Sequence, residues 1–486
     1  MKTPRPTHLF FYRLRYVFGY AMLLALVAGT TLIAGLYAPG SLTQHEIDSL
    51  GVTHRINLND LGTLAVPDLP FHLLQKVSLE LFGVSMLSIK LPAMLLATVT
   101  GLALFFLLRR WFKPNATILT LLITGTTSQF MFVAQSGTPL ILYATYTALI
   151  LLFASLIVQM ARASWLWQFL LLLTISLSLY TPFFIYINLV LFIIGIIHPH
   201  TRNYIFRRIK SFNKLFTAIL LLAFIAPLAY LCIRTPAFFW ALTTVDIASV
   251  DIIANLKTLV QTYFWPRPFV SGGQMLPLMD FSAIALTLLG FMKTVQHHHT
   301  TRAYIIFTWL SLSLPLLILQ PHLTIIITAP LFILLAIGIE TLMKEWYRLF
   351  PRNPYARITG LFLLVCLIGV MVMSGVERYL GTYRYNPDVV ATGSTDITTF
   401  QRTFTDRNQP LSVIATEHER PLYQALAQYN YPQLVIATSF ADAEEEIIVV
   451  TRDARQQAGS AKAPLSEIIT NQRAHQADRF YIYTRP

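Results

Sequence analysis

Long apolar runs recur through the first 376 residues, and they constrain the fold more than any other feature of the chain. A helix needs about 20 mostly apolar residues to cross a bilayer. Soluble domains carry about 25% charged residues, whereas only 12% of this chain is charged. We therefore predict an α-helical polytopic membrane protein with about eleven transmembrane helices, near residues 16–38, 84–108, 116–134, 139–160, 164–180, 182–198, 214–233, 280–296, 303–320, 322–343 and 357–376.

The charges between these runs predict how the chain is oriented. With the N-terminus in the cytoplasm, 19 of the 25 Lys and Arg residues before position 377 fall in inner loops, and eight of the ten acidic residues fall outside. Loops rich in Lys and Arg stay in the cytoplasm. The sequence thus predicts a multi-pass plasma-membrane protein with a cytoplasmic N-terminus and an extracytoplasmic tail. The same charges give no sign of a nucleic-acid-binding surface.

Two domains are expected, residues 1–376 in the membrane and residues 377–486 outside it. The tail has strand-like runs at 411–415, 434–437, 447–451 and 480–484, and helical patterns near 394–407, 419–430 and 464–474. Strands that alternate with helices favour a small α/β domain with a largely parallel sheet. Segment 234–279 predicts an irregular outer loop with an interfacial helix near 246–264.

The acidic loop, residues 40–83, is the first candidate for chemistry. It holds five of the ten acidic residues that precede position 377. Carboxylates at a membrane face are costly to desolvate, so they either stay in water or serve a function. If residues 44–56 form a helix, His45, Glu46 and Asp48 lie within about one turn, and a carboxylate there can act as a general base. The alternative interpretation is an exposed acidic loop.

Several stretches resemble a known family. They are Leu42-Thr-Gln-His-Glu-Ile, Asp68-Leu-Pro-Phe-His-Leu-Leu, Leu81-Phe-Gly-Val-Ser, Lys90-Leu-Pro-Ala-Met-Leu-Leu, Arg109-Arg-Trp-Phe and Pro330-Leu-Phe-Ile-Leu-Leu-Ala-Ile-Gly. In this order they resemble the GT-C glycosyltransferases of the protein O-mannosyltransferase and lipid A aminoarabinose transferase kind. The resemblance covers roughly residues 10–345.

This resemblance implies an enzyme that transfers a sugar from a polyprenyl-phosphate donor to an acceptor hydroxyl on the outer face of the membrane. The acceptor is an envelope glycan, lipid or protein. Glu46 is the expected base, with Asp48 and His45 as the other candidates. Outward cations are expected to hold the donor phosphate, with Arg267, His322 and Lys257 preferred over Arg55, His72 and Lys76. No cofactor is indicated, and the cluster His297–His299 lies in a predicted inner loop without an accompanying acid.

Two departures from the family pattern keep other functions open. His45 stands where the family has its first acid, and the second loop, Ala134-Gln-Ser-Gly-Thr-Pro139, carries neither an acid nor an arginine. An inactive relative that binds the envelope or serves as a scaffold would show such losses. A transporter of lipid-linked sugars would instead carry ionisable residues inside its spans, and the predicted spans hold almost none.

The predicted orientation can be tested by cysteine scanning with a membrane-impermeant reagent. Because the tail is predicted to lie outside, cysteines introduced after residue 390 should be labelled in intact cells, and cysteines introduced within 200–212 should not. The reverse pattern would place the acidic loop in the cytoplasm and rule out chemistry on the outer face.

Overall fold

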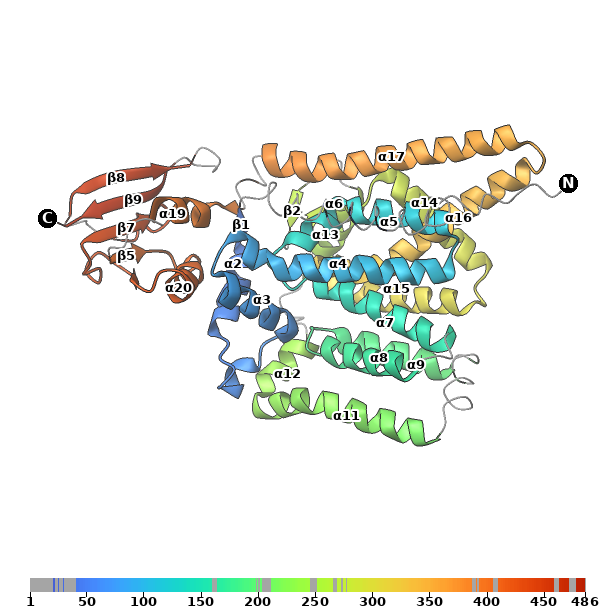
Figure 1. Cartoon of the computed structure of the whole chain (residues 1–486), viewed down its shortest axis with the longest axis horizontal. Helices are drawn as coiled ribbons and strands as arrows, with labels where there is room; N and C mark the ends of the chain where they lie inside the picture. Colours follow the sequence, from blue (N-terminus) through green and yellow to red (C-terminus); the bar gives the residue numbers. More distant parts are fainter. Residues whose placement is uncertain are drawn as a thin grey trace, which may run out of the picture.

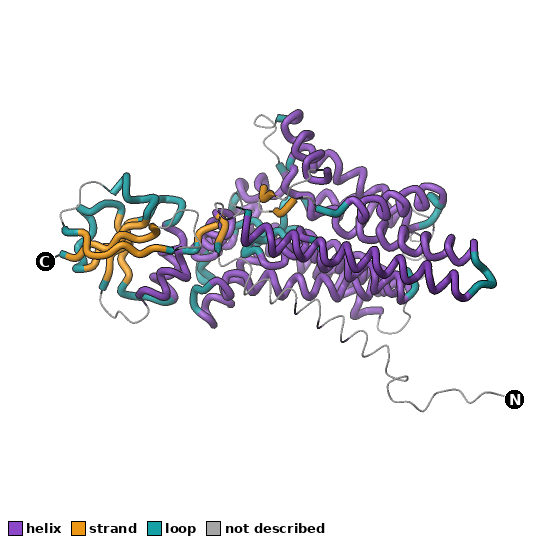
Figure 2. Tube along the Cα trace, turned by 90° about the horizontal axis from the view of Figure 1, so that it is seen from above, coloured by secondary structure: helices purple, strands orange, loops and turns teal. Residues whose placement is uncertain are grey.

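The computed structural model describes residues 41–486, except 160–163, 245–250, 265–268, 405–409, 459–462, 472–477, 486 and parts of 198–210, 272–277 and 387–392; before residue 41 it describes only residues 21, 25 and 29. Figure 1 shows a body of helices that run mostly along one direction, with a β-sheet at one end. The perpendicular view in Figure 2 shows the same elongated arrangement.

Six described helices are long and apolar enough to cross a membrane, or seven if one bent pair counts as a span. The bent pair, α5 (Pro114–Thr126) and α6 (Ser128–Gln135), turns by 62°. The six are α4 (Met86–Trp111), α7 (Ile141–Gln159), α11 (Ser211–Arg234), α15 (Thr301–Leu319), α16 (Thr328–Leu349) and α17 (Pro354–Tyr385).

The polytopic helical fold is thus confirmed, and within the described residues six or seven of the roughly eleven expected helices are long enough to count as spans. Three of the predicted runs form shorter helices, and 16 residues reach only about 24 Å, less than the roughly 30 Å of a bilayer core. The first run, 16–38, lies almost wholly outside the described residues. The three shorter helices are α8 (Ser164–Ser178), α9 (Phe184–Ile197) and α14 (Phe281–Gln296).

Tight joints explain why the helices break where they do. Between α8 and α9 the chain turns at Tyr180–Phe183, and Phe183 adopts the left-handed conformation with φ 65°. Between α15 and α16 lies a 3-10 helix, η4 (Pro321–Ile327). Both joints contain a proline, which cannot continue the preceding helix.

The short elements that connect the apolar helices lie toward the end of the helical body that is nearer the sheet, and α2, α3 and β1 stand next to the tail (Figure 1). The expected interfacial helix near 246–264 is α13, which begins at Ile252, and a short hairpin follows it. The elements are β1 (Leu42–Thr43), α2 (Gln44–Arg55), η1 (Leu61–Leu64), α3 (Leu69–Phe82), α12 (Pro236–Thr243), α13 (Ile252–Phe264), β2 (Phe269–Ser271) and β3 (Gln274–Leu276).

The tail folds around a five-stranded sheet of order β6-β5-β7-β9-β8. β5 pairs in parallel with β6 and β7, whereas β9 is antiparallel to β7 and β8, so the sheet is mixed rather than largely parallel. The elements are β4 (Gly393–Ser394), α19 (Asp396–Phe404), β5 (Leu411–Ile414), α20 (Arg420–Tyr429), β6 (Leu434–Ala437), β7 (Ile447–Thr451), β8 (Leu465–Thr470) and β9 (Asp478–Thr484).

One predicted element of the tail is wrong. Residues 464–474 were expected to be helical, but Leu465–Thr470 is the edge strand β8, which pairs with β9. Its β-branched residues Ile468, Ile469 and Thr470 favour a strand, and the partner that fixes this choice lies later in the chain.

The tail shares its hydrophobic core with the acidic loop. One buried cluster contains Leu50 of α2, Leu79 of α3, Phe400 of α19 and Tyr423 of α20. Strand β1 pairs with β4, and a Cβ placed on Gly51 would come within 2.8 Å of Pro421 Cβ. The acidic loop is therefore packed between the membrane helices and the tail. The predicted domain boundary at residue 376 falls inside α17.

Two glycines allow α14 and α16 to touch through their backbones. A Cβ on Gly290 would lie 1.9 Å from the Leu334 carbonyl oxygen, and a Cβ on Gly338 would lie 2.0 Å from the Leu286 carbonyl oxygen. Small residues of this kind let membrane helices approach closely.

Gly290→Ala should therefore destabilise the protein by about 1–3 kcal/mol, the usual effect of overpacking, because a backbone atom is in the way. Gly369→Ala in α17 is the matched control, since a Cβ there meets nothing within 4 Å. Thermal unfolding in detergent measures both variants. Equal unfolding temperatures for the two would contradict the proposed contact.

Candidate active site

Glu46 has a local structural role at the start of α2. Thr43 caps α2, and Glu46 is the third residue of the helix. Glu46 Oε2 accepts hydrogen bonds from the Thr43 backbone N (2.7 Å) and from Thr43 Oγ1 (3.0 Å). Thr43-Gln-His-Glu46 is thus a capping box, in which the cap residue and the third helical residue hydrogen-bond to each other's backbone N–H groups.

The second oxygen of Glu46 joins three segments. Oε1 accepts a hydrogen bond from the Gly137 backbone N at 2.7 Å, and it lies 3.5 Å from Lys90 Nζ in α4. Both side chains of this ion pair are 2% exposed, and Lys90 also donates to the Ser41 carbonyl. Breaking a buried pair by removing one partner costs about 3–5 kcal/mol. Glu46 is therefore fully occupied by donors.

A chain of buried hydrogen bonds continues from Glu46 into α3. Gln75 Nε2 donates to the Gly137 carbonyl at 3.2 Å, and Gln75 Oε1 accepts from Thr53 Oγ1 at 2.5 Å. Thr53 Oγ1 also lies 2.8 Å from His72 Nδ1. Because the single Thr53 proton is directed to oxygens that can only accept, Gln75 Oε1 and the Ser49 carbonyl, we infer that His72 donates from Nδ1. Burial lowers the pKa of His72 to about 4, so His72 is neutral and does not supply a cation for a phosphate.

Asp68 lies one turn before His72 and is buried like Glu46, but its hydrogen bonding differs. Its backbone is left-handed (φ 57°), and its N donates to the Tyr180 carbonyl at 2.8 Å. Asp68 Oδ1 and Thr181 Oγ1 are buried without a well-aligned hydrogen-bond partner. Burial raises the pKa of Asp68 to about 7, although Thr181 acts in the opposite direction. An acid with this pKa is suited to accept or donate a proton near neutrality.

Sequence reasoning placed Asp68 in a family stretch but gave it no role. The signal available was an acid between two prolines, Pro67-Asp-Leu-Pro70. A left-handed non-glycine residue with an unpaired buried oxygen is a reason to suspect function.

The other two predicted acid–base residues lie on the surface of α2. His45 and Asp48 are both exposed. Asp48 Oδ1 accepts from Gln44 Nε2 at 2.9 Å, and the same amide donates to the His418 carbonyl of the tail. The structure therefore separates the three candidates. Glu46 is buried, whereas His45 and Asp48 are exposed, and Asp48 lies beside the contact between α2 and the tail.

The predicted phosphate-binding residues are only partly described. Arg267 lies outside the described residues, and so does the side chain of His322, whose backbone belongs to η4. Lys257 is exposed on α13, and Asn255 of the same helix donates to the carbonyls of Ile318 and Leu319 just before η4. Helix α13 thus packs beside the turn that carries His322.

The remaining cations and acids add no second site near the loop. Lys76 donates to the Ile56 carbonyl and lies 4.0 Å from Glu80, and Arg55 is exposed. Within the described part of the chain, no group of three or more His, Cys, Asp and Glu residues is arranged to hold a metal ion.

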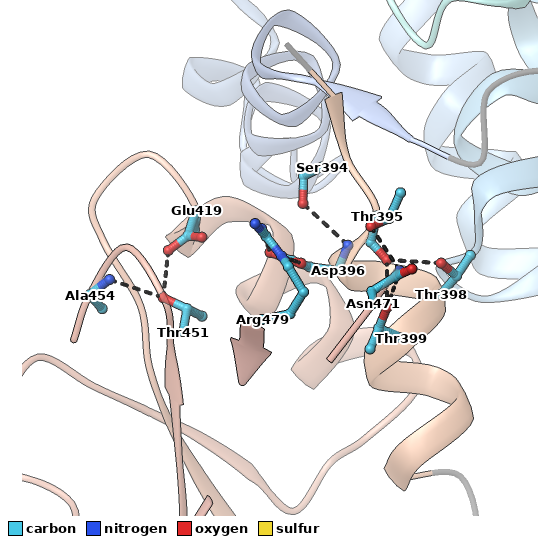
Figure 3. A network of polar contacts seen from close by, with 10 residues as sticks. All are labelled: Ser394, Thr395, Asp396, Thr398, Thr399, Glu419, Thr451, Ala454, Asn471 and Arg479. Atoms are coloured by element: carbon cyan, nitrogen blue, oxygen red, sulfur yellow. Dashed lines mark hydrogen bonds and ion pairs between the residues drawn. The ribbon is translucent and has the colours of Figure 1, made fainter. Parts of the chain in front are cut away.

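A polar network stands at the carboxyl ends of β5 and β7 in the tail (Figure 3). Arg479 donates to both oxygens of Asp396, at 2.6 and 2.7 Å. Glu419 Oε2 accepts from Thr451 Oγ1 at 2.7 Å. Burial raises the pKa of Glu419, while the Thr451 and Thr416 hydrogen bonds oppose the rise. These bonds fix α19 and the loop before α20 to the sheet.

Comparison with known proteins agrees with this architecture. Residues 69–231 match the family model for dolichyl-phosphate-mannose-protein mannosyltransferase. ArnT from Cupriavidus metallidurans, solved with undecaprenyl phosphate, has a TM-score of 0.56 at 14% identity, over 96% of this chain and 98% of that one. The oligosaccharyltransferase AglB from Archaeoglobus fulgidus, solved with an inhibitory peptide and a dolichol-phosphate, has a TM-score of 0.50 at 10% identity, over 91% and 70%. No curated protein matches the sequence. The resemblance predicted from the sequence and an ArnT-like GT-C fold are thereby confirmed.

The pKa values of Asp68 and His72 predict opposite effects of pH on stability. Asp68 has a raised pKa, from 3.8 to about 7, so its contribution is full below pH 4 and is lost as the pH rises to 7. His72 has a lowered pKa, from 6.5 to about 4, so its contribution is full above pH 6.5 and is lost as the pH falls to 4. In the unmodified protein the two trends oppose each other.

Asp68→Asn should therefore give a protein whose stability rises with pH between 4 and 7, and His72→Gln one whose stability falls. Each slope is at most about 1.4 kcal/mol per pH unit. Unfolding midpoints measured across this range decide the matter. Parallel curves for both variants and the parent protein would show that neither group titrates as described.

Proposed function

We propose that this multi-pass membrane protein is a glycosyltransferase that moves a sugar from a polyprenyl-phosphate donor to an acceptor hydroxyl at the acidic loop. The family match over residues 69–231 and the fold shared with ArnT over nearly the whole chain support this class of reaction. The observation that carries the proposal is the acidic loop itself: it is packed between the membrane helices and the tail, and it holds both a buried and an exposed acid.

In the proposed reaction the acceptor oxygen attacks the anomeric carbon of the donor sugar, and the bond from that carbon to the lipid phosphate breaks. The acceptor proton passes to a base, and the phosphate leaves on its lipid. Cations on the same face, with Lys257, His322 and Arg267 as the candidates, would stabilise the charge that develops on the phosphate.

The contacts of the acids support a division of roles within the loop. Glu46, the base expected from the family pattern, is engaged by Lys90, Gly137 and Thr43, and we propose that it holds the loop in place. We propose Asp68 as the main proton acceptor, because its Oδ1 is buried without a well-aligned hydrogen-bond donor and its pKa of about 7 leaves much of it ionised at neutral pH. Asp48 and His45 remain the exposed alternatives.

An inactive relative that binds envelope material is the second candidate. One observation favours it: the second loop offers Glu46 a backbone N–H, from Gly137, and no acid. Such a protein would still bind the donor lipid or an envelope polymer but would transfer no sugar.

Asp68→Asn should lower turnover of a radiolabelled polyprenyl-phosphate sugar by about 100- to 10,000-fold, the usual contribution of a general base. Glu80→Gln is the matched control, since Glu80 is an exposed acid of the same loop, and it should change turnover less than about twofold. Glu46→Gln should instead lower the yield of folded protein, because Lys90 is then left buried without its partner. Glu46→Gln with Lys90→Met should restore part of that yield.

Donor binding measured alongside turnover separates the assignments. Normal turnover in Asp68→Asn together with loss in Asp48→Asn or His45→Ala would move the base to α2. Normal turnover in all three would show that the loop supplies no base. Donor binding without transfer by the unmodified protein, across several sugars and acceptors, would favour the inactive relative.

A further inference from the structure

A second polar site lies at the end of the helical body opposite the tail. A cavity of about 510 Å³ opens there between the end of α14, the start of α15 and the end of α16, with Phe112 from the α4–α5 connection on its wall. Figure 1 shows these helix ends far from the acidic loop. The cavity is therefore separate from the candidate active site.

The charges around this cavity are predominantly positive. Lys293, Arg302 and Lys344 line it, together with Glu340 and Glu345. Both carboxylates already have cationic partners: Glu340 lies 3.1 Å from Lys344, and Glu345 lies 3.7 Å from Arg348 outside the cavity.

The other two cations rest on neutral groups. Lys293 Nζ donates to Gln296 Oε1 at 3.3 Å. Arg302 Nη1 donates to the Trp111 carbonyl, and the guanidinium lies over the Trp111 and Phe112 rings at 5.4 and 5.6 Å. Glu340 also attracts Arg302, but this single carboxylate is shared with Lys344, which lies 3.1 Å from its Oε1. Lys293 and Arg302 thus leave positive charge in the cavity that the described acids balance only in part.

The depth of the cavity matches the headgroup layer of a membrane. Arg302 opens a candidate span that ends at Leu319, and the α4 and α16 spans end at Trp111 and Leu349. Aromatic residues with a polar edge gather at the interface between lipid and water, and Trp111 and Trp346 lie at these helix ends, with Tyr347 next to Trp346. A phosphate group bound at this depth would be within reach of a membrane lipid.

We propose that this cavity binds the phosphate of an anionic glycerophospholipid, with Lys293 and Arg302 as its principal ligands. A basic pocket between membrane helices is suited to such a headgroup because it combines charge with lateral access from the lipid. The site is independent of the proposed sugar transfer, which uses the opposite end of the molecule.

The test uses the full-length protein in a neutral detergent, titrated with phosphatidylglycerol or with phosphatidylcholine, and follows bound lipid by native mass spectrometry. Phosphatidylglycerol should bind at least about tenfold more tightly than phosphatidylcholine. Each cation near a membrane surface is worth about 1 kcal/mol, or roughly fivefold, so Lys293→Gln with Arg302→Gln should weaken phosphatidylglycerol binding by about 30-fold. Binding of phosphatidylcholine should not change.

Lys113→Gln with Arg352→Gln is the matched control, because both residues are exposed at the same end but do not line the cavity. This control should bind phosphatidylglycerol within about twofold of the unmodified protein, since an exposed charge that does not line the cavity is screened by water and salt. Lys293→Gln alone should cost about fivefold, and it decides the question if the Arg302 variant does not fold.

Three results would overturn the proposal. The first is an equal loss in the cavity variant and the control, which would indicate attraction to general surface charge only. The second is binding of inorganic phosphate that displaces the lipid at equal concentration, which would make a soluble phosphate compound the ligand. The third is a clear preference for undecaprenyl phosphate over phosphatidylglycerol, which would make this a second site for the donor lipid.

Discussion

The buried ion pair between Glu46 and Lys90 fixes the geometry around the acidic loop. Removing each of these charges from water costs several kcal/mol. The buried pair is therefore stable only when further hydrogen bonds satisfy the remaining oxygens and protons. Thr43 and the Gly137 N–H donate hydrogen bonds to Glu46, and the Ser41 carbonyl accepts one from Lys90. One carboxylate therefore joins the start of α2, the second loop and α4. Helix α2 cannot shift without leaving a charge unpaired among apolar side chains.

The tail depends on the same junction. Phe400 and Tyr423 of the tail belong to one buried cluster with Leu50 and Leu79 of the acidic loop, and Gly51 leaves room for Pro421. A domain that shares its core with a loop holds that loop rigidly, because interiors are close-packed and transmit displacement. The tail thus has a structural role that does not depend on any ligand of its own: it covers the acidic loop on the side away from the membrane helices.

Sequence patterns predicted the membrane fold well because the physical cause is local. An apolar run can satisfy its backbone in lipid only as a helix, so the runs locate the helices. At α8, α9 and α14 the predicted apolar runs form helices of 15, 14 and 16 residues, since a helix ends where its neighbours and turns require, as at Phe183. The mistaken helix at Leu465–Thr470 has a related cause. Its short amphipathic pattern fits either structure, and pairing with β9 decides for a strand.

The candidate site was predictable only to the level of the loop. Its excess of acids is visible in the sequence, and so is the Thr43-Gln-His-Glu46 pattern, which indicates a capping box and hence a structural use for Glu46. The burial of Asp68 is not visible, because it depends on the Tyr180 carbonyl and on Thr181, more than 100 residues later in the sequence. An acid that is used to hold a helix and an acid that is buried without a well-aligned donor look alike in a sequence. Only their neighbours distinguish them: Glu46 is held by Lys90, Gly137 and Thr43, and this contrast is the basis on which we propose Asp68 as the proton acceptor.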